Sequence, residues 1–187
     1  MAPQPWKILD SRMAFDHQWC KVRQDTVQLP NDTIIDDYFV TLGPEVAIVV
    51  PITPEGMVVF VRQYRHGIQQ VLIELPAGHF NPEEEAAEVA ARRELQEETG
   101  YGSDRWMFLG KIYDNPPKET NANHLFLAEN VTQISAPQLD VTEEIELVHI
   151  SISEVMDAVF RGDLCVSGTI SALVFALHKC DRSNLVG

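Results

Sequence analysis

Apolar and polar residues alternate over much of the chain, and this pattern predicts β-strands. Two runs rich in β-branched residues, EVAIVVPI (45–52) and MVVFVRQY (57–64), flank the turn sequence TPEG. Such a pair predicts a β-hairpin. Shorter alternations in residues 17–41 predict a strand, a turn and a strand, and VLIEL (71–75) predicts a short strand that ends at a proline. The first part of the chain is therefore expected to form mainly antiparallel sheet.

Three helices are predicted among these strands. Residues 83–99 are rich in Ala, Glu, Arg and Leu, which favour helix. Ser151 and Glu154 have the spacing of a capping box at a helix start, and residues 169–179 predict a final apolar helix. Further strands are predicted at WMFLGKIY, NHLFLAENV and IELVHISI. Because strands outnumber helices and are mostly joined by short links, the pattern predicts an α+β fold.

Length and charge limit the classes of function. The 187 residues are expected to form one domain with a sizeable core. The net charge of -14 argues against nucleic-acid and membrane partners, and an anionic substrate would need a cation or local arginines to approach. Three cysteines without metal-ligand spacing, no signal-peptide pattern and no long apolar run predict a soluble cytoplasmic protein.

The stretch RRELQEETG (92–100) concentrates negative charge on one predicted helix. Spacings of three and four residues place Glu94, Glu97 and Glu98 on one face, where like charges repel. Arg93 precedes Glu97 by four residues, so its guanidinium can hold that carboxylate. Converging carboxylates are the ligands that Mg²⁺ prefers. The alternative is an ordinary solvated helix face.

The surrounding sequence, ELPAGHFNPEEEAAEVAARRELQEETGY (74–101), resembles the signature of the Nudix hydrolase family. That family has a Gly, a Glu, an Arg-Glu pair, a Glu-Glu pair and a closing Gly with an apolar residue at set spacings. Here these fall on Gly78, Glu85, Arg93-Glu94, Glu97-Glu98 and Gly100-Tyr101. The chain departs from the family at one point, because six residues rather than five separate Gly78 from Glu85. This implies a longer loop and leaves the role of Glu85 open.

The resemblance implies a Nudix fold, with a mixed sheet between helices, and Mg²⁺-dependent hydrolysis of a nucleoside diphosphate linked to another group. Mn²⁺ is an alternative ion. By the family pattern the backbone carbonyl of Ala77 joins Glu94, Glu97 and Glu98 as a metal ligand. Arg93, Glu97 and Glu98 are the catalytic residues that the same pattern implies.

Two stretches outside the helix narrow the resemblance. VRQYR (61–65) followed by ELPAG (74–78) looks like the ADP-ribose pyrophosphatase subgroup, which implies that Arg62, Arg65 and Glu74 lie near substrate. The alternative for an arginine there is a surface position at a strand end. The expected reaction splits ADP-ribose into AMP and ribose 5-phosphate. GDP-mannose or another nucleotide sugar is an alternative substrate, and a non-catalytic nucleotide sensor is an alternative of a different class.

The stretch TEEIEL (142–147) resembles the late loop of the family, which carries an additional glutamate as base or metal ligand. Glu143 and Glu144 compete for this role, and Glu143 is preferred. The alternative is that both are exposed loop charges.

The N-terminal residues suggest association between two copies of the chain. Residues 1–43 are interpreted as a strand region belonging to the same domain as the Nudix part, 44–187. Its strands have no evident partner sheet, and exposed strand edges are usually paired or covered. Together with the resemblance, this predicts a homodimer in which residues 17–41 help to build the partner's substrate site. Arg62 or Arg65 would then face an aromatic side chain of the other copy. The alternative is a small sheet packed on its own domain.

Overall fold

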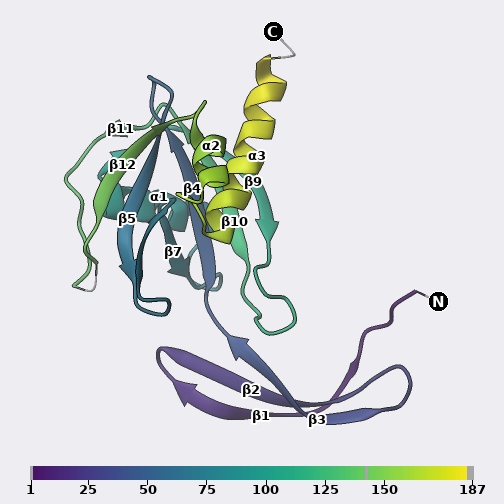
Figure 1. Ribbon diagram of the computed structural model, residues 1–187. Helices are drawn as coiled ribbons and strands as arrows, with labels where there is room; N and C mark the ends of the chain where they lie inside the picture. The colour runs from purple at the N-terminus through teal and green to yellow at the C-terminus, as the bar shows by residue number, and fades with distance from the viewer. Residues whose placement is uncertain (1, 142, 185–187) are drawn as a thin grey trace. The chain divides into compact units, whose positions relative to one another are not determined.

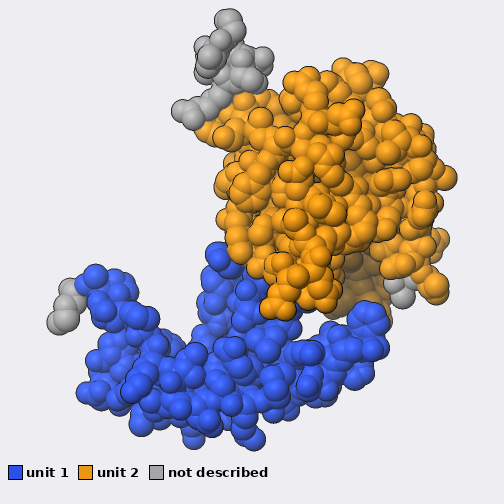
Figure 2. Space-filling view, turned by 180° about the vertical axis from the view of Figure 1, so that it is seen from behind, with its two compact units in different colours: residues 1–44, 113–121 blue, residues 45–112, 122–187 orange. Residues whose placement is uncertain are grey.

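The computed structural model describes residues 2–141 and 143–184. The chain divides into two compact units. Unit 1 contains residues 1–44 and 113–121, and unit 2 contains residues 45–112 and 122–187 (Figure 2). No helix in the described part of the chain is long and apolar enough to cross a membrane.

Unit 1 is built on a three-stranded antiparallel sheet in the order β1-β2-β3. Its strands are β1 (Lys7–His17), β2 (Cys20–Gln28) and β3 (Ile34–Leu42). The prediction for residues 17–41 is confirmed for β2 and β3, but it missed β1. The register of β1 shifts twice against β2, between Ile8 and Asp10 and between Met13 and Phe15. These irregularities break the period of two, so the apolar residues of β1 do not alternate regularly.

Residues 113–121 join the end of β3. The amide N–H of Thr41 donates to the carbonyl of Lys118 at 2.7 Å, and the Tyr38 hydroxyl donates to the carbonyl of Pro117 at 2.6 Å. The ammonium group of Lys118 lies 5.0 Å from the centre of the Tyr38 ring. A loop far along the chain therefore belongs structurally to the N-terminal strands.

Unit 2 contains a seven-stranded mixed sheet. Its main order is β12-β5-β4-β10-β9, with β6 pairing to β5 and β7 to β4. The β4-β10 pair is parallel and the others are antiparallel. The strands are β4 (Glu45–Ile52), β5 (Met57–Arg65), β6 (Gln70–Glu74), β7 (Ala77–Phe80), β9 (Arg105–Ile112), β10 (Asn123–Glu129) and β12 (Glu146–Ser151). A two-stranded ribbon of β8 (Tyr101–Gly102) and β11 (Thr132–Gln133) completes the set.

Helices cover both faces of this sheet, with α1 on one side and α2 and α3 on the other (Figure 1). They are α1 (Ala87–Thr99), α2 (Val155–Arg161) and α3 (Ser167–Asn184). Val49 belongs to the same apolar cluster as Leu95 of α1, whereas its neighbour Val50 belongs to the cluster of Leu173 of α3. Successive side chains of a strand point to opposite faces, which is why one strand serves both layers. The predicted sheet between helices is confirmed.

Two predicted helix starts are displaced. The helix expected from residue 83 begins at Ala87, because the carbonyl of Asn81 accepts the N–H groups of Glu84 and Glu85 in a turn, at 3.0 and 2.9 Å. The predicted capping box is wrong. Helix α2 has no side-chain cap, and the Ser151 hydroxyl instead lies 2.8 Å from that of Ser153. In both places a local turn competes successfully with the first helical turn.

Candidate active site

A cavity of about 650 Å³ in unit 2 brings together most of the predicted site residues. It lies between α1, the ends of β5 and β7, and the loop that precedes β12. The predicted residues that line it are Arg65, Ala77, Arg93, Glu94, Glu97, Glu98 and Glu143. Gln63, Tyr64, Gly78, His79, Gln138 and Asp140 also line it.

Arg93 connects the acidic side chains of this cavity. Its guanidinium donates to both carboxylate oxygens of Glu85, at 3.2 Å from Nε and 3.0 Å from Nη2. The Nη1 atom lies between two helix carboxylates, 2.6 Å from Glu94 and 3.0 Å from Glu97. These carboxylates, Glu85 foremost, raise the pKa of Arg93, so it stays protonated. Although the loop after Gly78 is one residue longer than in the family pattern, Glu85 still forms an ion pair with Arg93. In this structure Glu85 therefore helps to hold Arg93 in place.

Gly78 is required by the closeness of β7 to α1. A Cβ atom at this position would lie 1.8 Å from the carboxyl carbon of Glu94. No side chain larger than hydrogen fits without displacing that carboxylate. The sequence pattern of a Gly followed by an Arg-Glu pair thus has a steric basis in this fold.

Glu98 is the most deeply buried of the three helix glutamates, with 3 % of its surface exposed. Burial raises its pKa to about 8, and the negative charges of Glu94 and Glu143 act in the same direction. The N–H of Ala77 donates to its Oε2 atom at 3.1 Å and opposes the shift. Burial also raises the pKa of Glu94. Without a metal cation nearby, both shifts therefore favour the protonated, neutral form of these carboxyl groups.

The chemical types of these donors suit a divalent cation, although their spacing in the structure does not enclose one. Three carboxylates and Ala77 border one cavity, and hard oxygen ligands are those that Mg²⁺ binds. A nearby cation would also relieve the raised pKa of the buried Glu98. Among the described residues, no three His, Cys, Asp or Glu side chains converge closely enough to enclose an ion, and Arg93 contacts both Glu94 and Glu97.

Arg65 is held at the cavity by a buried carboxylate. Its Nη2 and Nε atoms lie 2.6 and 2.8 Å from Oε2 of Glu74, which also accepts from Gln63 at 3.4 Å. Glu74 is buried and Arg65 is about half exposed, so Glu74 supports a guanidinium that stays accessible. Arg62 does not line the cavity. It pairs with Glu146 of β12 at 2.8 Å, directly across the strand register.

The late loop places one of its two candidate glutamates at the cavity. Glu143 lines it, whereas Glu144 does not. The Glu143 carboxylate accepts the N–H of Asp140 at 2.9 Å, so the loop closes on itself. Thr142, the first residue of the predicted loop motif, lies outside the described residues.

Several cavity residues had no signal in the sequence. Gln63 and Tyr64 lie within the stretch VRQYR, but only its arginines were singled out, and Gln138 and Asp140 lie in a loop without recognisable pattern. Burial and the charge of Arg65 lower the pKa of His79. Only the fold places these residues beside the helix glutamates.

Comparison with known proteins identifies the class to which this fold and cavity belong. Residues 42–163 match the NUDIX domain, so the chain belongs to the Nudix hydrolase family, as the signature indicated. Residues 6–41 match the nucleoside diphosphate sugar hydrolase N-terminal domain. The second match covers the three strands of unit 1, and it places the chain with the Nudix proteins that carry this N-terminal domain.

Individual relatives agree with this assignment. The chain is 30 % identical over 174 residues to an ADP-ribose pyrophosphatase of Bacillus subtilis, covering 92 % of this chain and 93 % of the relative. It is 28 % identical over 170 residues to a methanol dehydrogenase activator of Bacillus methanolicus, covering 90 and 91 %. A crystal structure of an ADP compounds hydrolase superposes with a TM-score of 0.87 over 98 % of both chains, at 21 % identity. That structure confirms the fold.

Proposed function

We propose that this chain hydrolyses the pyrophosphate of ADP-ribose, or of a related nucleoside diphosphate sugar, to a nucleoside monophosphate and a sugar phosphate. The observation that carries the proposal is one cavity in which Glu94, Glu97 and Glu98 face the same space as the supported guanidinium of Arg65. Carboxylates that bind a divalent cation and an accessible arginine together suit a pyrophosphate. The printed names of the relatives, ADP-ribose pyrophosphatase and ADP compounds hydrolase, support the substrate class.

The side chains of the cavity would divide the work of hydrolysis. Mg²⁺ held by Glu94, Glu97, Glu98 and the Ala77 carbonyl would supply charge neutralisation and Lewis acidity. Arg65 would bind a phosphate oxygen, and Arg93 would keep the helix carboxylates in place. Glu143 would take the proton of the attacking water as the new oxygen–phosphorus bond forms and the bridging bond breaks. The bridging oxygen would leave on the other phosphate.

A substrate panel tests this proposal directly. Purified chain is incubated with ADP-ribose, GDP-mannose and other nucleotide sugars, with Mg²⁺ or with excess chelator, and the products are separated. We expect monophosphate and sugar phosphate from ADP-ribose, and no turnover in chelator. Equal rates with excess chelator and with Mg²⁺ would rule out a metal requirement. Mn²⁺ added in place of Mg²⁺ should also support turnover.

The same panel separates the alternatives. Faster turnover of GDP-mannose than of ADP-ribose would move the assignment to another nucleotide sugar. Tight binding of a nucleotide sugar without turnover would indicate a ligand sensor instead of an enzyme. We expect the activity in the cytoplasm.

We further propose that the chain is a homodimer in which the β1–β3 sheet contributes to the partner's substrate site. The support is a set of exposed apolar side chains on unit 1, which a second copy of the chain would cover. The exposed side chains are Trp6, Ile8, Leu9, Met13, Phe15, Trp19, Ile34 and Phe39. Light scattering should give twice the chain mass of 21.1 kDa. A mass of one chain would exclude the dimer, and a deletion of residues 1–41 that stays folded and binds ADP-ribose normally would exclude the shared site.

A further inference from the structure

The C-terminal turn of α1 carries two of the three cavity glutamates and must satisfy its own backbone. The last carbonyls of a helix have no partner within the helix. Gly100 is left-handed (φ 74°) and its N–H closes on the carbonyl of Gln96 at 2.8 Å. The carbonyl of Glu97 accepts the N–H of Gln138 at 2.7 Å. The last turn contains no basic side chain, so these N–H groups complement the negative end of the helix.

The donor Gln138 belongs to a segment, residues 131–138, that we call the strap. The N–H groups of Ile134 and Ser135 both donate to the carbonyl of Gly100, at 2.8 and 3.1 Å. The strap packs so closely on Gly100 that no side chain fits at this position, because a Cβ atom there would lie 2.3 Å from the carbonyl oxygen of Ser135. At its start the strap is tied to the central sheet, where the N–H of Val131 donates to the carbonyl of Ile52 at 2.9 Å.

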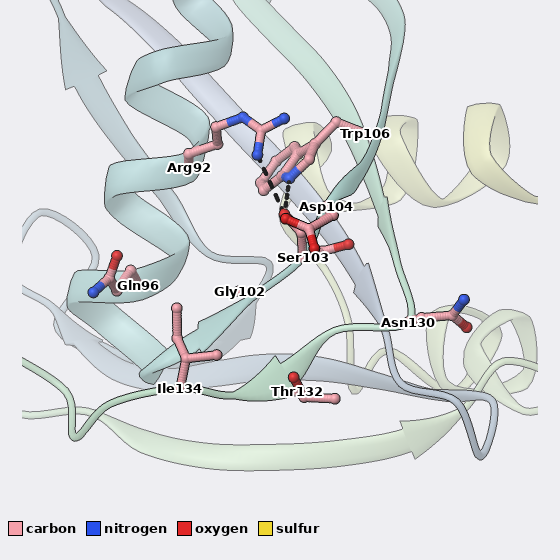
Figure 3. A pocket seen from close by; sticks show the side chains of 9 residues that line it. All are labelled: Arg92, Gln96, Gly102, Ser103, Asp104, Trp106, Asn130, Thr132 and Ile134. Atoms are coloured by element: carbon pink, nitrogen blue, oxygen red, sulfur yellow. Dashed lines mark hydrogen bonds between the residues drawn. The ribbon is translucent and has the colours of Figure 1, made fainter.

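The strap runs from one side of α1 to the other. Its first half borders a separate cavity of about 370 Å³, where Thr132 and Ile134 lie across from Gln96 and Gly102 (Figure 3). Its last residue, Gln138, lines the cavity of the glutamates. The strap therefore reaches the candidate active site only after it has been fixed to the end of the helix.

The last helical turn is held from two directions. On the side of β7, the N–H of Ala77 donates to the Glu98 carboxylate at 3.1 Å. On the side of the strap, the N–H of Gln138 donates to the Glu97 carbonyl. The Glu97 side chain itself is 43 % exposed and is held by Arg93 alone among the described residues. Its direction thus depends on how well its own backbone is fixed.

We propose that Gln138 is a positioning residue for Glu97 and Glu98, and that it acts through its main-chain N–H. This hydrogen bond sets the angle at which both carboxylates enter the cavity. This proposal rests on the proposed function, because Glu97 and Glu98 matter for turnover only if the chain is a hydrolase. Displacements of about 1 Å from a reactive geometry cost up to about 10²-fold in rate.

Removal of one N–H group tests the proposal. Gln138→Pro lacks the donor, and Leu139→Pro is the matched control because the N–H of Leu139 makes no hydrogen bond among the described residues. We expect Gln138→Pro to lower kcat by about 10- to 100-fold with KM changed less than about threefold. Mn²⁺ affinity, measured without substrate, should fall about tenfold. Leu139→Pro should keep both values, and equal kcat and Mn²⁺ affinity in the two proline variants would overturn the proposal.

Amide hydrogen exchange gives a readout that does not depend on turnover. The amides of Gly100 and Tyr101 should exchange faster in Gln138→Pro than in the wild type and in Leu139→Pro, whereas Gln138→Ala should keep the wild-type protection. If Gln138→Pro does not fold, an ester in place of the 137–138 amide removes the same N–H without the ring. Unchanged exchange in the ester variant would refute the role of the strap. Absence of any nucleotide-sugar hydrolysis by the wild type would instead refute the proposed function.

Discussion

The two sheets of this molecule use the same strand pairing but differ in what covers them. In unit 2 four successive residues of β5, Val58–Val61, have no exposed surface, because helices pack on both faces. In unit 1 every residue of β1 is exposed, and among the described residues only Val27 and Val40 are buried apolar side chains. Antiparallel strand pairing therefore forms a sheet in both units, but an apolar core forms only where helices pack on the faces of that sheet.

This difference separates the two tasks that we assign to the chain. The covered unit can bury a carboxyl group such as Glu98 and raise its pKa, because the layers on each face exclude water from it. The uncovered sheet has no such site and presents apolar side chains to its surroundings. We therefore expect the chemistry to depend on unit 2 and association to depend on unit 1. The following predictions test this division.

The largest effect is expected from Glu98→Gln in the covered unit. The amide cannot carry the negative charge that the carboxylate would offer to a bound cation, it changes the volume little, and its oxygen can still accept the N–H of Ala77. Turnover should fall about 10³-fold, as when one group that stabilises charge in the transition state is removed. The thermal unfolding temperature of the metal-free protein should not fall. Wild-type turnover by this variant would show that the buried carboxylate is not part of the chemistry.

A smaller effect is expected at the edge of the same cavity. Glu143→Gln should lower kcat about 10²-fold, the lower end of the range for a general base. Glu144→Gln is the matched control, because Glu144 is the next residue in the chain and does not line the cavity. Initial rates under saturating substrate compare the two variants. A change below tenfold in both would mean that a helix glutamate or the metal activates the water.

The sequence predicted unit 2 better than unit 1, and the reason is physical. Strands buried on both faces, such as β4 and β5, leave long β-branched runs that are easy to recognise. The bulged, exposed β1 leaves no such pattern, and nothing local indicates that residues 113–121 pair with β3. Within the site, spacing along one helix gave Glu94, Glu97 and Glu98. Gln138 was not predictable, because its contact is made by a backbone N–H.

Packing of the covered unit is tested by Gly78→Ala. The added methyl group would lie 1.8 Å from the Glu94 carboxyl carbon, so β7 or the carboxylate must move. We expect a loss of about 3 kcal/mol in the free energy of unfolding, at the upper end for an overpacked site. Gly67→Ala is the matched control, because no atom lies within 4 Å of its Cβ position. Its unfolding free energy should stay within about 0.5 kcal/mol of the wild type. Equal urea midpoints for the two variants would contradict the tight contact between β7 and α1.

The smallest effect is expected in unit 1, where the buried Asp25 forms an ion pair with Arg23. In unit 2 the interior is filled by apolar side chains instead. Asp25 is 3 % exposed and accepts hydrogen bonds from Arg23 at 2.8 Å and from the Ser11 hydroxyl at 2.6 Å. The hydrogen bonds from Arg23 hold the pKa of Asp25 below its usual value. A depressed folded-state pKa adds stability above the unfolded pKa of about 4, and that stability is lost as the pH falls through the lower folded value.

Asp25→Asn should therefore reduce the free energy of unfolding by about 1 kcal/mol at pH 7. The difference from the wild type should shrink as the pH falls from about 4, where the unfolded carboxyl takes up a proton, through the lower pKa of the folded carboxyl. Asp16→Asn is the matched control, because Asp16 is exposed and lies 3.6 Å from Lys21. Chemical denaturation at pH 7 and pH 3 measures both variants. A pH-independent loss in Asp25→Asn would show that shape, and not charge, holds the sheet of unit 1 together, and the contrast with the apolar core of unit 2 would then need another cause.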